Sequence, residues 1–131
     1  SVKKGGGHNH RYNLSDEILI KDNHISAEGR LKALVKKAIR TKKLVTVEIE
    51  NIYQLKEING LKFKRILFDN MNTQQLKKCL KLCKNKYQTE YSGNATLKNI
   101  KNISKIGINR ISVGAITHSA KSFDTSLRFK N

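Results

Sequence analysis

Polar residues that could do chemistry collect where short apolar runs of this chain end. The run Ile18–Ile20 leads directly into Lys21, Asp22, Asn23 and His24. A strand that delivers such residues at its carboxyl end is how α/β barrels present their active-site groups. Polar residues follow later apolar runs in the same way, at Glu48 to Asn51, Asp69-Asn70, Ser92 to Asn94 and Gly114 to Ser119. The sequence therefore predicts a site where several strand ends meet.

Three carboxylates are candidates for the interior of this site. Strand side chains alternate between faces, so Glu48 and Glu50 share one face, and Asp69 extends the set from the next run. Buried carboxylates are costly unless they meet cations or a metal ion, and Lys21 is a cation that could reach them. Two interpretations stay open: a site for chemistry with Mg²⁺, which hard oxygen ligands suit, or an internal ion-pair network without chemistry.

Two glycine sites indicate a place for phosphate. Ser92-Gly93 lies between an expected strand and helix, and Gly114 follows the last expected strand. Small residues let backbone N–H groups approach an anion, and barrel enzymes often bind phosphate between their last strand-end loops. The alternative is that both glycines only form turns.

Histidine and cysteine give a weaker signal for metal. The four histidines have no i, i+4 pair, which argues against a zinc site. Cys79 and Cys83 lie on the apolar stripe of an expected helix, so we expect two reduced core thiols. His10, Arg11 and Lys21 could instead hold a small polycarboxylate, with Lys3 and Lys4 as less specific additions.

Short β-type runs alternate with helical patterns, which predicts an α/β fold with parallel strands. Ser26, Asn72 or Thr73 are expected N-caps, and Gly60 is an expected helix stop. The expected strands are 17–21, 45–49, 65–68, 87–91 and 110–113, and the expected helices are 27–41, 52–59, 73–84 and 97–106.

A complete eight-stranded barrel needs roughly 250 residues, whereas this chain has 131 and about five expected strands. The sequence therefore predicts part of an incomplete, open-sided α/β barrel of TIM-barrel type, or else a small open sheet. Open sheet edges are normally avoided, so we expect the physiological polypeptide to be longer at its N-terminus.

The formal net charge of +17 raises the question of nucleic acid or an anionic membrane as partner. Lysine is spread along the whole chain, and no arginine-rich stripe with interleaved aromatic residues is present. We therefore expect a solvated basic surface, with no nucleic acid or membrane partner. No apolar run approaches the roughly 18 residues of a membrane span, and we expect a cytoplasmic protein.

The motifs form an ordered set that covers nearly the whole chain: Gly5-Gly6-Gly7, Asn9-His10-Arg11, Leu14-Ser15-Asp16, Leu19 to His24, Val47 to Asn51, Leu67 to Met71, Ser92-Gly93 and Ser112 to Ser119. Together they resemble the C-terminal half of quinolinate phosphoribosyltransferase, the carboxylating nicotinate-nucleotide pyrophosphorylase family. The resemblance implies that residues 1–131 are the C-terminal portion of a barrel domain. An N-terminal α/β sandwich and the first barrel strands would then lie outside this chain.

The resemblance also implies an activity. That family converts quinolinate and phosphoribosyl pyrophosphate into nicotinate mononucleotide, carbon dioxide and pyrophosphate in NAD biosynthesis. It needs Mg²⁺, and it works as a homodimer or higher homo-oligomer. By itself the 131-residue chain is expected to lack useful turnover.

Residue roles follow from the matching motifs. His10, Arg11 and Lys21 would bind quinolinate, and Lys21, Glu48 and Asp69 would be the catalytic residues. The ribose and Mg²⁺-pyrophosphate would be handled by Glu48 and Asp69. The resemblance places the 5′-phosphate at Ser92, Gly93, Gly114 and His118.

One departure and three alternatives accompany the resemblance. Asn94 stands where the family usually has a second glycine, although asparagine tolerates left-handed backbone. The alternatives are a barrel paralogue related to molybdenum-transport operons, a non-catalytic remnant that keeps a phosphate pocket, and a nucleic-acid binder. Binding of quinolinate, the effect of changing Lys21, Glu48 or Asp69, and salt-dependent DNA affinity would distinguish them.

Overall fold

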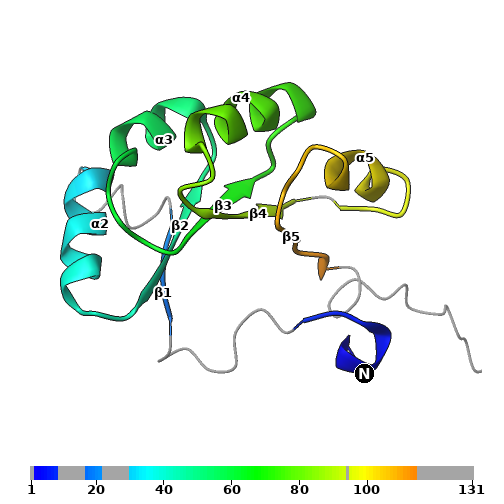
Figure 1. Ribbon diagram of the computed structural model, residues 1–131, viewed down its shortest axis with the longest axis horizontal. Helices are drawn as coiled ribbons and strands as arrows, with labels where there is room; N and C mark the ends of the chain where they lie inside the picture. Colours follow the sequence, from blue (N-terminus) through cyan, green and yellow to red (C-terminus); the bar gives the residue numbers. More distant parts are fainter. Residues whose placement is uncertain (1, 9–16, 22–29, 94, 115–131) are drawn as a thin grey trace, which may run out of the picture.

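Five parallel strands lie side by side in the order in which they occur along the chain. The computed structural model describes residues 2–8, 17–21, 30–93 and 95–114. The strands are β1 (Glu17–Ile20), β2 (Leu44–Ile49), β3 (Arg65–Asp69), β4 (Gln88–Ser92) and β5 (Arg110–Ile111). The helical segments are η1 (Val2–Gly5), α2 (Leu31–Arg40), α3 (Ile52–Ile58), α4 (Thr73–Cys83) and α5 (Ile100–Ser104). The predicted alternation of parallel strands and helices is confirmed (Figure 1).

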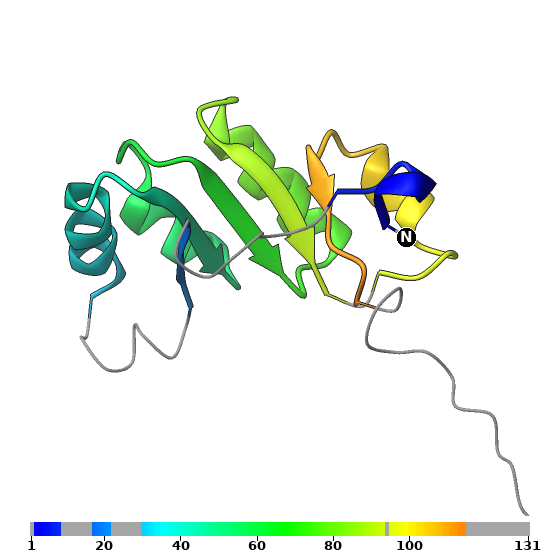
Figure 2. The same cartoon turned by 90° about the horizontal axis from the view of Figure 1, so that it is seen from below.

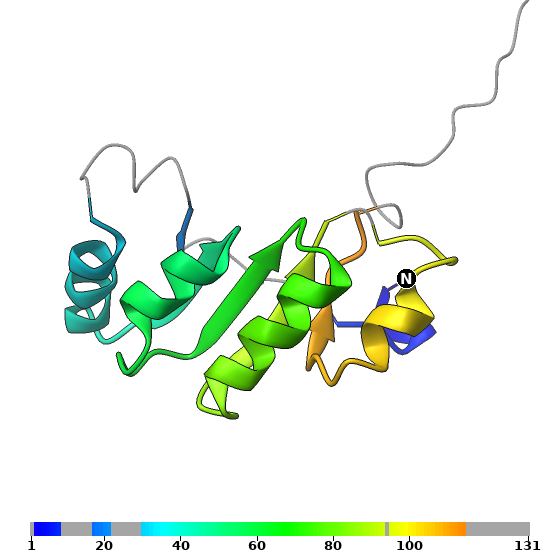
Figure 3. The same ribbon diagram turned by 90° about the horizontal axis from the view of Figure 1, so that it is seen from above.

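Helices α2 to α5 cover one side of the sheet. In Figure 3, α3 and α4 lie in front of the strands, whereas in Figure 2 the strands lie in front of these two helices. The core forms between these layers, where Val47, Ile49 and Phe68 from the strands are fully buried with Leu55 and Leu76 from the helices. Burial of apolar side chains is the main stabilising term, so this layer fixes which strand face turns toward the helices.

The predicted helix boundaries hold best where a side chain caps the helix. Asn72 caps α4: its side chain accepts from the Gln75 N–H at 2.9 Å, and the Asn72 N–H donates to the Gln75 side chain at 3.0 Å. This reciprocal pair satisfies two N–H groups that the helix itself leaves without partners. Gly60, at φ +94°, follows the C-cap of α3, as expected for a helix stop.

Other boundaries differ from the prediction. The N-cap position of α2 is Arg30, which makes no side-chain capping hydrogen bond, so Ser26 is not the N-cap of this helix; Ser26 itself lies outside the described residues. Helix α5 begins at Ile100 because the Thr96 N–H and the Asn99 side chain, 2.7 Å apart, form a turn first. Strand β5 has only two residues, although the Ser112 N–H still donates to the Tyr91 carbonyl oxygen at 2.8 Å.

No helix among the described residues is long and apolar enough to cross a membrane.

Candidate functional site

The strand register separates an apolar face from a polar one. Side chains of neighbouring parallel strands that are paired in register point the same way. We call the sheet face opposite the buried Val47, Ile49 and Phe68 the polar face. It carries Glu17, Leu19, Leu44, Thr46, Glu48, Arg65, Leu67, Asp69, Gln88, Glu90, Ser92 and Arg110. The predicted division between apolar residues toward the helices and carboxylates on the other face is therefore confirmed for Glu48 and Asp69.

Four predicted site residues lie at the carboxyl ends of neighbouring strands. Asp69 is paired in register with Ser92, and both are half-buried. Glu48 is also half-buried. It is paired in register with Leu67, which lies two residues before Asp69 on β3. The pairing of Ile20 with Val47 puts the next residue, Lys21, at the register position beside Glu48. Glu50 lies beyond the end of β2 and is exposed, so the expectation of a buried Glu48–Glu50 pair is wrong.

The two glycine sites have different surroundings. Gly93 has φ +143°, and a Cβ at this position would lie only 2.7 Å from Asn70 Oδ1 and 3.1 Å from the Tyr91 hydroxyl oxygen. A side chain there would have to displace its neighbours, so this backbone is both unusual and closely approached. Gly114 is exposed and has open space where its Cβ would be.

Three predicted site residues, His10, Arg11 and His118, lie outside the described residues. Their assignments to quinolinate and to the 5′-phosphate stay predictions. The same holds for Asn94.

Sequence reasoning missed a buried charge network lower on the polar face. Arg65 is 2% exposed, and its Nη1 lies 3.2 Å from Glu90 Oε2 and 3.5 Å from Glu17 Oε1. The Thr46 hydroxyl donates to Glu17 Oε1, and the Ser112 hydroxyl donates to Glu90 Oε1. Among the described residues, Arg65 Nε is the one buried side-chain nitrogen or oxygen without a hydrogen-bond partner.

A buried cation–carboxylate network was expected around Lys21, Glu48, Glu50 and Asp69, but Glu48 and Asp69 are only half-buried and Glu50 is exposed, so this expectation is corrected. Lys21 is exposed, and the buried charges belong to Glu17, Arg65 and Glu90. A signal for them was present in the sequence, since each is a charged residue inside an expected strand. Glu90 is a further candidate site residue. It lies on the same face of β4 as Ser92, two residues before it, and accepts a hydrogen bond from the Ser112 hydroxyl, two residues before Gly114.

Metal ligands are sparse in the described part of the chain. No group of three or more His, Cys, Asp or Glu residues there could hold a metal ion. The half-buried carboxylates of Glu48 and Asp69 fit Mg²⁺, which keeps several waters and is usually held by one or two carboxylates together with substrate phosphates. A site that binds the ion mainly through a substrate would have this donor set.

The two cysteines are core residues, as predicted. Cys79 and Cys83 are unbridged and at most 1% exposed. Burial raises the pKa of the Cys79 thiol, and burial together with the nearby Cys79 raises the pKa of Cys83 to about 11. Thiols that stay protonated are poor metal ligands and poor nucleophiles.

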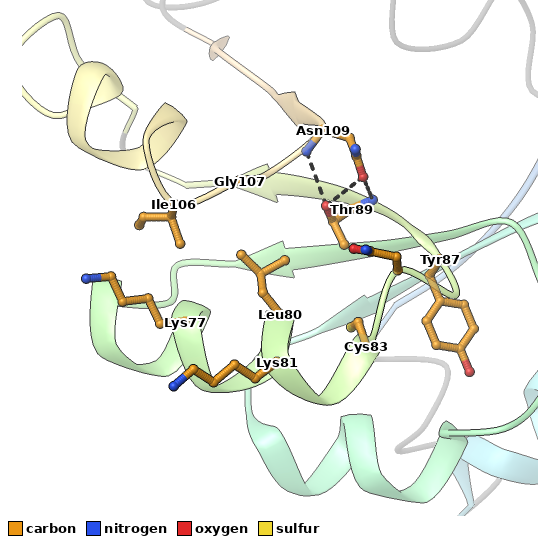
Figure 4. A pocket seen from close by; sticks show the side chains of 10 residues that line it. Lys77, Leu80, Lys81, Cys83, Tyr87, Thr89, Ile106, Gly107 and Asn109 are labelled. Carbon is orange, nitrogen blue, oxygen red and sulfur yellow. Dashed lines mark hydrogen bonds between the residues drawn. The ribbon is translucent and has the colours of Figure 1, made fainter.

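Two cavities lie away from the candidate site at the carboxyl ends of the strands. One, of about 430 Å³, is lined by α4 residues, the start of β4 and the segment after α5 (Figure 4). There Asn109 Oδ1 accepts from the Thr89 N–H and hydroxyl, both at 2.8 Å. The other, of about 580 Å³, is lined by residues 60–63 with Lys86 and Tyr87. Neither cavity is lined by a carboxylate or by any of the candidate site residues Lys21, Glu48, Asp69, Ser92 and Gly93.

The parallel sheet, its helices on one side and the polar side chains at its carboxyl ends define a domain of the α/β-barrel class. Residues 1–128 match the family model described as quinolinate phosphoribosyl transferase, C-terminal domain, and the chain belongs to this family. Its fold is the C-terminal part of an incomplete α/β barrel of TIM-barrel type.

Similar proteins carry related names. A probable carboxylating nicotinate-nucleotide pyrophosphorylase of Bacillus subtilis is 40% identical over 130 residues, covering 97% of this chain and 45% of that protein. The chloroplastic carboxylating nicotinate-nucleotide pyrophosphorylase of Arabidopsis thaliana is 37% identical over 149 residues, covering 98% of this chain and 43% of the relative. This chain therefore spans less than half the length of these relatives.

Solved structures show the same likeness. The crystal structure of a NadC deletion mutant superposes with a TM-score of 0.86 at 37% identity, covering 94% of this chain and 44% of that one. NadC from Streptococcus pyogenes superposes with a TM-score of 0.82 at 37% identity, covering 98% of this chain and 46% of that one.

Proposed function

We propose that the polypeptide carrying this chain transfers phosphoribose from phosphoribosyl pyrophosphate to quinolinate and decarboxylates the product to nicotinate mononucleotide. The observation that carries the proposal is the arrangement of Glu48, Asp69 and Ser92-Gly93 at neighbouring strand ends of one polar face. This arrangement offers carboxylates to a sugar and a glycine loop to its phosphate. Membership of the family supports the assignment.

These residues are suited to the chemistry of the proposed reaction. The quinolinate nitrogen forms a bond to the anomeric carbon of the ribose, and the bond to pyrophosphate breaks. Positive charge develops on the sugar in the transition state, and the carboxylates of Glu48 and Asp69 stabilise that charge. The carboxylate next to the ring nitrogen then leaves as carbon dioxide, and its bonding electrons pass into the pyridinium ring. The ring carbon finally takes up a proton.

Basic residues would bind the second substrate. Quinolinate is a dianion, and His10, Arg11 and Lys21 would hold its carboxylates so that the nitrogen faces the sugar. The 5′-phosphate would lie against the backbone of Ser92, Gly93 and Gly114, with His118 nearby. Glu48 and Asp69 would also hold Mg²⁺ on the substrate pyrophosphate, where the ion neutralises charge on the leaving group.

The test is turnover by the full-length polypeptide. We expect release of carbon dioxide from carboxyl-labelled quinolinate only when phosphoribosyl pyrophosphate and Mg²⁺ are present. Lys21→Met, Glu48→Gln and Asp69→Asn should each lower kcat/KM by roughly a hundredfold or more. Glu57→Gln, an exposed change on α3, should leave it unaltered. Activity that survives all three site changes would show that the catalytic assignment is wrong.

The context of the chain is part of the proposal. We place residues 1–131 in the C-terminal portion of a barrel domain, with a sandwich domain and further barrel strands elsewhere in the polypeptide. The full-length protein would form a homodimer or higher homo-oligomer in the cytoplasm. Sedimentation of the full-length protein tests the assembly, and microscopy of a tagged protein tests the location.

A further inference from the structure

Asn70 lies between the two strand ends that form the candidate site. It follows Asp69 at the end of β3, and its backbone is left-handed at φ 49°. Its N–H donates to the Ser92 carbonyl oxygen at the end of β4, over 2.8 Å. The turn that follows the carboxylate is thus bonded directly to the glycine loop of the next strand.

The Asn70 side chain occupies the space beside Gly93. A Cβ built on Gly93 would lie 2.7 Å from Asn70 Oδ1, closer than real Cβ atoms come, and 3.2 Å from Asn70 Cα, which is an unusually tight contact. The backbone of residue 93 therefore packs against the amide of Asn70. At its other end, the same amide donates from Nδ2 to Asp69 Oδ2 over 3.5 Å. One side chain contacts both the carboxylate and the glycine loop.

We propose that Asn70 is a positioning residue that fixes the spacing between the Asp69 carboxylate and the Ser92-Gly93 backbone. It acts through these groups and need not touch the substrate. The proposal rests on the proposed function for its ligand, a ribose 5-phosphate group whose hydroxyls face Asp69 and whose phosphate faces Gly93. Such a ligand binds well only if both partners are held at the right separation beforehand.

The test uses Asn70→Gly in the full-length polypeptide. Glycine tolerates a left-handed backbone and keeps the N–H that bonds to Ser92, so the substitution removes only the side chain. Asn85→Gly is the matched control, because Asn85 is an exposed asparagine with φ 59° in the turn before β4. Calorimetry would measure binding of ribose 5-phosphate and, in separate titrations, of quinolinate.

We expect Asn70→Gly to raise the Kd for ribose 5-phosphate by roughly tenfold or more and to leave the Kd for quinolinate unaltered. Asn85→Gly should change neither constant. Asn70→Asp tolerates the same backbone but has no side-chain N–H, so it should not restore binding.

Several results would overturn the proposal. They are wild-type affinity in Asn70→Gly, wild-type affinity in Asn70→Asp, an equal loss for both ligands, or a wild-type protein that does not bind ribose 5-phosphate. Turnover is measured on the same samples. A wild-type protein that binds ribose 5-phosphate but makes no nicotinate mononucleotide would contradict the proposed function and still decide the role of Asn70.

Discussion

Arg65 separates two carboxylates that would otherwise repel each other on the polar face. Its Nη1 contacts Glu90 at 3.2 Å and Glu17 at 3.5 Å, and all three residues are buried. Arg65→Met keeps much of the side-chain volume but removes the buried cation that contacts both carboxylates. We expect this change to lower the free energy of unfolding by about 3–5 kcal/mol, measured by urea denaturation.

The control for this prediction neutralises the whole network. The triple variant Glu17→Gln, Arg65→Met, Glu90→Gln removes all three charges of this network, and its amide oxygens can still accept from the Thr46 and Ser112 hydroxyls. It should regain most of the stability that the single change removes. Equal stability of Arg65→Met and the wild type would show that the ion pairs do not support the fold.

Cys83 makes stability depend on pH in the alkaline range. Its pKa is raised from 9.0 to about 11, so the folded state holds the thiol proton more tightly than the unfolded state. The resulting contribution to stability is complete below pH 9 and is lost as the pH rises to about 11. We expect wild type to lose on the order of 2 kcal/mol more than Cys83→Ala over this range.

The measurement is denaturant unfolding of both proteins at several pH values from 8 to 11. All other titratable groups are present in both proteins and cancel in the comparison. Parallel pH curves for the two proteins would rule out this role for the thiol.

The loop after β4 requires glycine at position 93. In Gly93→Ala the new methyl group would meet Asn70 Oδ1 at 2.7 Å and the Tyr91 hydroxyl at 3.1 Å, at a φ of +143° that L residues rarely adopt. We expect this change to lower the free energy of unfolding by about 1–3 kcal/mol, measured by thermal unfolding. It should also weaken the binding of ribose 5-phosphate, measured by calorimetry.

Gly60→Ala is a control that introduces the backbone strain of a positive φ without a steric clash. Gly60 also has positive φ, at +94°, but nothing lies within 4 Å of its Cβ position. This control should lose some stability and keep its affinity for ribose 5-phosphate. Equal affinity losses in both variants would show that the close packing at Gly93 does not shape the site.

The net charge of +17 makes the whole molecule sensitive to salt. With 27 basic and 10 acidic residues, the folded chain repels itself, and salt screens this repulsion. Raising sodium chloride from 20 to 300 mM should increase the thermal unfolding midpoint by roughly 4 °C.

Reducing the charge should weaken this response. Lys78→Glu with Lys81→Glu changes two exposed residues of α4 and lowers the net charge by four, from +17 to +13. The variant should show a smaller shift than wild type when both are followed by circular dichroism. An unfolding midpoint that does not move with salt would contradict this prediction.

Much of the fold was predictable from local pattern. Strands β2, β3 and β4 were located to within one residue at each end because apolar runs bounded by polar residues mark buried parallel strands. The start of α4 was found from Asn72, since a capping side chain acts within one turn. Strand β5 and helix α5 were overestimated because their ends depend on contacts with β4 and on a local turn.

The site was predictable in part. Strand alternation placed Glu48 and Asp69 on one face, and parallel pairing brought Asp69 beside Ser92. The buried partners of Arg65 could not be derived, because Glu17 and Glu90 lie 48 positions before it and 25 positions after it. Only the strand register determines that these charges meet.

The sequence by itself determined the class of fold, the edge of the sheet where the polar groups gather and the family to which the chain belongs. These properties follow from periodicity, strand ends and ordered motifs, which are local or additive along the chain. The tertiary structure alone decided that Glu17, Arg65 and Glu90 form the buried network and that Asn70 packs on Gly93. Such contacts join distant strands, and their geometry is fixed only when the sheet assembles in register.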